Sequence, residues 1–100
     1  MMTQMLIRQV RAKLLVRRGE LVEGERLARE AVELGRPTDA LEAKANSLRD
    51  LAVVLSAAKK RNEALDALDE AQRLYQEKGH TIGATYVEEL RAGLAAGRGG

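Results

Sequence analysis

The chain repeats its own pattern of small, apolar and acidic residues at a spacing of forty residues. Seven positions show the repeat, because Ala12, Leu15, Glu23, Leu27, Glu30, Ala31 and Leu34 return as Ala52, Leu55, Glu63, Ala67, Glu70, Ala71 and Leu74. A third, partial copy begins at Ala92. Repetition on this scale indicates stacked supersecondary units, each of which covers the apolar face of its neighbour. Such an architecture favours a surface for binding over a pocket for chemistry.

The composition restricts the repeating unit to helices. Hydrophobic residues make up 45% of the 100 residues, yet the chain contains no Cys, Phe or Trp. Alanine and leucine must therefore build the core, which favours closely packed helices over a sheet rich in β-branched and aromatic residues. We expect an all-α fold in a single small domain.

Apolar residues at helical spacing predict five helices, and three of the four turns between them contain glycine. The expected helices cover residues 3–18, 20–34, 39–58, 62–78 and 81–96, and the expected helix ends are Gly19, Gly35 and Gly79. We expect Thr38 or Asp39 to cap the third helix, with Glu42 completing a capping box behind Asp39, and Asn62 to cap the fourth.

These helices divide the domain into repeat units. Residues 1–96 form one domain of two units and an extra helix, and the glycine-rich tail is expected to be disordered. The units span residues 3–35 and 39–79, the extra helix spans 81–96, and the tail is 97–100. Gly24 and Ala64 occupy the same place in the two units, where small side chains allow close helix contact.

The chain shows the pattern A-x-x-L, then a turn, then a small residue and a second A-x-x-L. This pattern resembles the tetratricopeptide repeat. The residues that carry it are Ala12, Leu15, Gly19, Gly24, Ala28 and Ala31 in the first unit and Leu51, Ala52, Leu55, Ala64, Leu68 and Ala71 in the second. The period exceeds the usual ~34 residues and approaches that of HEAT and armadillo repeats, but the short turn after Arg18 favours the tetratricopeptide interpretation. The resemblance implies antiparallel helix-turn-helix repeats, an α-solenoid fragment of five helices.

The chain resembles a longer variant of the tetratricopeptide repeat more closely. Residues 17–32 and 64–79 are similar to paired segments near the C-termini of bacterial multidomain regulators, including class III nucleotide cyclases and transcriptional activators with an ATPase module. The chain holds none of their catalytic or DNA-binding modules. The resemblance therefore implies a non-catalytic assembly or regulatory segment, which the chain could supply as the C-terminal part of such a protein.

In tetratricopeptide arrays the first helix of each unit lines a concave groove. Projecting this chain onto that arrangement places six residues on the groove: Gln9, Lys13, Arg17, Arg49, Val53 and Ser56. The lysine and asparagine clamp of the chaperone-binding members is not reproduced here. A groove that carries three cations favours a protein or peptide partner of acidic character. The alternative is that these are ordinary solvated residues on an exposed helix face.

Catalytic, metal-binding and cofactor-binding sites are not expected. His80 is the only histidine and falls in a turn beside Gly79, where a solvated role is expected. Ser47 and Ser56 share a helix that contains no histidine, so a Ser-His-Asp triad would have to take its base from the next turn. The acidic residues of the fourth helix stand without the histidine or cysteine that a zinc site requires. We therefore predict that the chain is not an enzyme and binds no cofactor.

The uneven charge leaves one alternative function open. Residues 1–19 carry five basic side chains and no acid, although the net charge of the chain is only +2. A nucleic-acid-binding helical domain could use this first helix to follow phosphates. Pairing with the acidic segment at residues 20–35 explains the same charges more simply. The absence of cysteine and of any apolar run of about 20 residues agrees with a cytoplasmic protein that does not enter a membrane.

The ends of the array predict assembly. Two units and one helix fall short of the roughly three units that such arrays need for a continuous core. The last helix presents more apolar residues than one neighbour can cover: Ile82, Tyr86, Val87, Leu90 and Leu94. We expect this face to support a homodimer, or to dock against further repeats in a longer parent protein.

Overall fold

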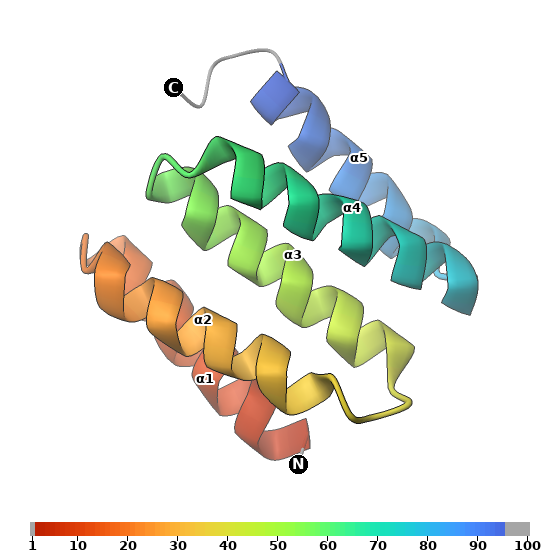
Figure 1. Cartoon of the computed structure of the whole chain (residues 1–100), viewed down its shortest axis with the longest axis horizontal. Helices are drawn as coiled ribbons and strands as arrows, with labels where there is room; N and C mark the ends of the chain where they lie inside the picture. Colours follow the sequence, from red (N-terminus) through yellow and green to blue (C-terminus); the bar gives the residue numbers. More distant parts are fainter. Residues whose placement is uncertain (1, 96–100) are drawn as a thin grey trace.

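Five helices in series make up nearly all of the described chain. The structure is a computed structural model that describes the backbone of residues 2–95 and the side chains of residues 7, 8 and 10–94. Its helices are α1 (Met2–Arg17), α2 (Leu21–Gly35), α3 (Leu41–Ala57), α4 (Arg61–Lys78) and α5 (Thr81–Ala95) (Figure 1). No strand occurs between residues 2 and 95, so the all-α prediction is confirmed. The predicted disordered tail at residues 97–100 lies outside the described residues.

Three of the four turns share one backbone geometry. Gly19, Lys59 and Gly79 have positive φ angles of 80°, 66° and 78°. A backbone hydrogen bond of 2.8 Å closes each turn, from Glu20 to Leu15, from Lys60 to Leu55 and from His80 to Tyr75. This is the Schellman arrangement, which glycine adopts without the steric cost that a side chain imposes. The repeat of forty residues therefore extends to the backbone, where Lys59 replaces the glycine of the first turn.

The turn between α2 and α3 corrects two expectations about helix ends. Gly35 is the last residue of α2 and is buried, and the chain continues through Arg36 in a right-handed conformation, so no left-handed cap forms. Ala40 precedes α3 without a side-chain cap, which excludes the capping box of Asp39 and Glu42. Thr38 turns back instead and donates from Oγ1 to the carbonyl of Gly35 at 2.7 Å. The same oxygen accepts from the backbone N–H of Ala40 at 3.4 Å, but Ala40 precedes α3, so Thr38 does not cap the first turn of that helix.

The fourth helix also begins without the cap expected from the sequence. Lys60 takes the cap position of α4 and makes no side-chain cap hydrogen bond, so Asn62 lies inside the helix. The reason is the Schellman turn at Lys59, which starts the helix earlier than Asn62 would.

Helices α1, α3 and α5 run in the same direction, and α2 and α4 return between them (Figure 1). Each helix packs against the next one along the chain, and α3 also contacts both α1 and α5. Small residues allow this close packing, because Ala12, Ala52 and Ala64 are each at most 2% exposed. A Cβ atom on Gly24 would lie 3.3 Å from the carbonyl oxygen of Ala12. The close contacts predicted at Gly24 and Ala64 are therefore confirmed.

Candidate functional site

A hollow of about 580 Å³ lies where α1, α3 and α5 face one another. In Figure 1, α1 and α5 are the more distant helices, and α2 and α4 lie nearer the viewer. Ten residues line it: Val10, Lys13, Leu14, Val16, Arg17, Arg49, Asp50, Val53, Val54 and Tyr86. We call this hollow the central groove. Its volume is within the range of about 300–1,000 Å³ that is typical of ligand sites.

The structure brings together most of the residues that the sequence placed on a concave face. Lys13 and Arg17 from α1, and Arg49 and Val53 from α3, all line the central groove. Ser56 does not, and lies in a neighbouring hollow that it shares with Val53. The side chain of Gln9 is outside the described residues.

The central groove is positively charged, with one acid in its floor. Asp50 is only 8% exposed. One of its carboxylate oxygens accepts from the Arg49 guanidinium at 3.1 and 3.2 Å, and the other lies 3.4 Å from Nζ of Lys13. Arg17 is exposed and forms no ion pair with another described residue. Three cations against one carboxylate leave a net positive groove, which attracts acidic ligands.

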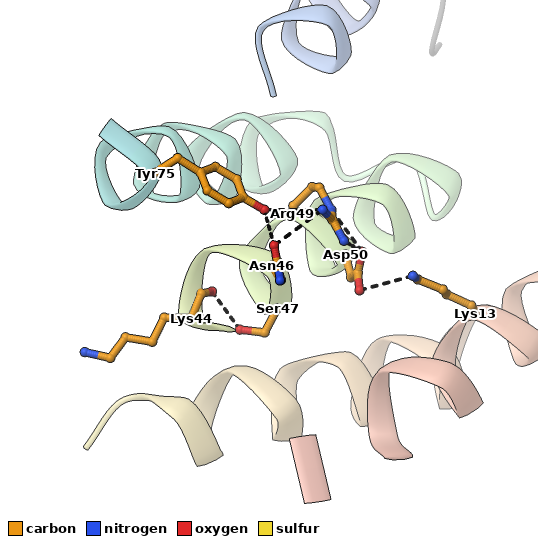
Figure 2. Close-up of polar contacts among 7 residues, drawn as sticks. All are labelled: Lys13, Lys44, Asn46, Ser47, Arg49, Asp50 and Tyr75. Carbon is orange, nitrogen blue, oxygen red and sulfur yellow. Dashed lines mark hydrogen bonds and ion pairs between the residues drawn. The ribbon is translucent and has the colours of Figure 1, made fainter. Parts of the chain in front are cut away.

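A buried polar network holds Arg49 in place. Figure 2 shows the Tyr75 hydroxyl pointing towards Asn46 and Arg49. The hydroxyl donates to Oδ1 of Asn46 and accepts from Arg49 at 3.3 Å. On the groove side, the guanidinium lies 5.5 Å from the ring centre of Tyr86, within cation–π range. Arg49 therefore joins α3 to both α4 and α5.

The network also affects proton binding. Burial is the largest single effect on Arg49 and by itself would lower its pKa, but the Asp50 carboxylate together with Tyr75 and Tyr86 outweighs it, so the pKa is raised and the cation is retained. Burial is likewise the main cause of the raised pKa of Tyr75. The groove therefore presents a permanently charged guanidinium that is oriented before any ligand arrives.

Apolar side chains cover much of the central groove between these charges. Val10 and Leu14 on α1 are 56% and 48% exposed, Val53 on α3 is 41% exposed, and Tyr86 on α5 is 43% exposed. Exposed apolar residues on both walls and the floor, beside cations, suit a segment that is both apolar and acidic.

His80 is a helix cap, which corrects the expectation of a solvated turn residue. Its Nδ1 accepts from the backbone N–H of Gly83 at 2.9 Å. Its Nε2 lies 3.3 Å from the Glu42 carboxylate, and its ring centre is 5.3 Å from that of Tyr75. The Schellman turn at Gly79 places His80 directly before α5, where an acceptor satisfies an unpaired N–H. Both ring nitrogens therefore have structural partners.

The other candidates for chemistry also have structural partners. Ser47 is 1% exposed and donates from Oγ to the carbonyl of Lys44 at 2.8 Å, within its own helix. Three acids of α4 pair with arginines: Glu63 with Arg29 at 2.6 Å, Glu70 with Arg36 at 3.8 Å, and Asp69 with Arg91. The described residues contain no group of three or more histidine, cysteine or acidic side chains able to hold a metal ion.

A second hollow of about 370 Å³ lies between α3, α4 and α5, and we call it the α5 hollow. Its lining is mostly apolar: Ala52, Val53, Ser56, Leu68, Glu89, Leu90, Gly93 and Leu94. A Cβ atom on Gly93 would meet nothing within 4 Å, so this side of α5 is open. Glu89 is the one charged residue of this lining.

The expected self-association face is divided by the packing of α5. Val87 is fully buried and Leu94 is 8% exposed, so both belong to the core of the chain, and of the two only Leu94 borders the α5 hollow. Leu90 is half-buried against that core, whereas Ile82 is 81% exposed. The reason is that α5 turns one face towards α4 and α3, which buries part of the predicted set.

Sequence reasoning missed several residues that shape the central groove. Asp50, Asn46 and Tyr75 form its buried network, and Val10 and Leu14 form its α1 wall. A signal for the network was present, since polar residues at i, i+3 and i+4 interrupt the apolar pattern of α3. The sequence pattern did not show which of these polar side chains would form hydrogen bonds or ion pairs in the folded chain.

Comparisons with protein-family models, with curated proteins and with solved structures found no match to this chain. Among the described residues, none of the helices has both the length and the apolar character needed to span a membrane.

Proposed function

We propose that the chain is a non-catalytic protein–protein interaction module whose central groove binds a peptide segment rich in acidic and apolar residues. The observation that carries the proposal is the convergence of Lys13, Arg17 and Arg49 with exposed apolar side chains in one hollow of about 580 Å³. Cations that attract carboxylates and apolar walls that accept aliphatic side chains are complementary to such a segment.

The tetratricopeptide resemblance supports this role. The Schellman turn recurs forty residues apart at Gly19 and Lys59, and α1, α3 and α5 together line the hollow, as the first helices of such units do. On this basis we propose a cytoplasmic assembly or regulatory segment, of the kind found near the C-termini of bacterial regulators. As part of the same proposal, the chain forms a homodimer or docks against further repeats.

The nucleic-acid alternative is less well supported, because basic residues of α1 already pair with carboxylates of the same chain. Arg8 donates to Glu30 of α2 at 2.9 Å, Lys13 pairs with Asp50, and Arg11 lies near enough to Glu23 to help lower the pKa of that carboxyl. Cations that already face carboxylates neutralise phosphates less effectively, so fewer counterions leave the nucleic acid and binding is weaker.

Fluorescence anisotropy with two labelled peptides tests the proposal. One peptide alternates glutamate and leucine, and the other replaces each glutamate with lysine. The acidic peptide should bind and the basic one should not. Arg17→Glu should weaken binding by about tenfold or more, since a like charge then faces the ligand. Arg73→Glu is the matched control, because Arg73 is exposed on α4 and lines none of the hollows described above.

Two results would overturn the proposal. Equal affinities for Arg17→Glu and Arg73→Glu would show that the groove is not the binding site. Tight binding of generic duplex DNA that falls steeply between low and moderate salt would support the nucleic-acid alternative instead.

A further inference from the structure

The α5 hollow is an unfilled apolar site at one flank of the molecule. Its floor and sides include Ala52, Leu90 and Leu94, and the missing side chain of Gly93 leaves it open. With a volume of about 370 Å³ it can accept aliphatic side chains. The charge at this hollow is negative, because Glu89 is the one charged residue of its lining.

Across the central groove from this hollow, α1 carries exposed side chains that are complementary to it in apolar character and charge. Val10 and Leu14 project from α1 and are 56% and 48% exposed, and Arg17 continues the same helical face three residues later. We call these three residues the α1 stripe. Residues 7–18 contain five cations and no acid, so the stripe lies on a basic helix.

The two surfaces cannot meet within one chain. Helix α3 lies between α1 and α5, and these two helices make no contact with each other in the described part of the chain. A second copy removes the obstacle, because its α1 stripe is free to approach the α5 hollow of the first. A twofold arrangement makes this contact twice and closes the assembly.

We infer that the chain forms a twofold dimer in which Val10 and Leu14 of each copy enter the α5 hollow of the other, with Arg17 facing Glu89. The inference rests on the assembly role proposed above but does not require the peptide ligand. Since the α1 stripe also lines the central groove, the dimer closes that groove, and acidic peptide and dimer exclude each other.

Size-exclusion chromatography with light scattering on the full chain, from low micromolar concentration upwards and without peptide, tests the inference. The parent should move from 11.0 kDa towards twice that mass as concentration rises. Leu14→Asp should weaken the dimer by about tenfold or more, since a carboxylate then enters an apolar site beside Glu89. Val22→Asp is the matched control, because Val22 is 88% exposed on α2, away from both surfaces.

Charge reversal identifies the contact. Arg17→Glu alone and Glu89→Arg alone should each weaken the homodimer, because each places like charges at both contacts. Mixing the two variants should restore the dimer as a heterodimer, in which both contacts again join opposite charges. Both positions are exposed, so circular dichroism should show the parent's helix content for each variant.

Each remaining outcome counts against the inference. A parent that stays at 11.0 kDa throughout would refute the dimer, and would leave the peptide-binding proposal intact. A dimer that survives Leu14→Asp, or variants that do not combine on mixing, would keep the assembly role but place its interface elsewhere.

Discussion

Replacing Gly83 with alanine should destabilise the chain, although the substitution improves helix propensity. A Cβ atom at this position would lie 2.5 Å from Cε1 of Tyr75 and 2.8 Å from Nδ1 of His80. Neither ring can move freely. Tyr75 is fully buried and its hydroxyl donates to Asn46, and His80 caps α5 through its hydrogen bond to residue 83 itself.

The magnitude follows from opposing effects. Alanine in place of glycine inside a helix gains about 1 kcal/mol. Overpacking of a dense core costs about 1–3 kcal/mol, and displacing the Tyr75 ring weakens hydroxyl hydrogen bonds worth about 1 kcal/mol. We therefore expect a net loss of about 1–3 kcal/mol in the free energy of unfolding.

Gly93→Ala in the same helix is the matched control. No atom lies within 4 Å of its Cβ position, so only the propensity gain remains, and stability should rise by up to about 1 kcal/mol. Urea unfolding followed by circular dichroism measures both variants. In thermal melts each kcal/mol corresponds to a shift of about 4–8 °C in a domain of this size. A Gly83→Ala variant as stable as Gly93→Ala would refute the packing argument.

Three further substitutions test the turns and the buried network. Lys59→Gly should raise stability by about 0.5–1 kcal/mol in urea unfolding, because φ is 66° at this residue, and an unchanged midpoint would show that the turn carries no strain. His80→Ala should cost about 1 kcal/mol through the lost cap, whereas a melt equal to the parent's would restore the view of a solvated residue. Tyr75→Phe should cost about 1–2 kcal/mol at neutral pH, measured in the same way, and parent-like stability would show that the hydroxyl bonds are dispensable. Burial raises the pKa of Tyr75 above its usual 10.0, so the unfolded chain loses this proton at lower pH than the folded chain. The free energy of unfolding should therefore fall as pH rises above 10. The Phe variant should lack this fall, and parallel pH profiles of stability for the two proteins would contradict the argument.

The sequence alone was sufficient to place the helices, although the caps expected at Gly35, Asp39 and Asn62 were wrong. Apolar residues at helical spacing predicted all five helices to within a few residues, because the period of the pattern and the period of the helix are the same. Gly19 and Gly79 marked their turns, since a left-handed residue favours glycine. Lys59 occupies the same geometry without that signal, and the forty-residue repeat was the only indication of it.

The candidate site was predictable only in outline. Projection onto the tetratricopeptide arrangement placed Lys13, Arg17, Arg49, Val53 and Ser56 on one face with Gln9, whose side chain lies outside the described residues. The first four line the central groove and Ser56 does not. The projection could not show that Asp50 neutralises part of that charge, because the pairing depends on the distance between α1 and α3.

Tertiary packing decided which residues of the same chemical type are buried and which are exposed. Gly83 and Gly93 are the same residue in the same helix, yet one lies against Tyr75 and the other faces open space. Val87 and Ile82 both belong to the apolar pattern of α5, but the first is buried and the second is 81% exposed. A local pattern determines that a helix forms, because its hydrogen bonds join residues four apart. Which face of that helix is covered depends on neighbours that are distant in the sequence, and only the folded chain brings them into place.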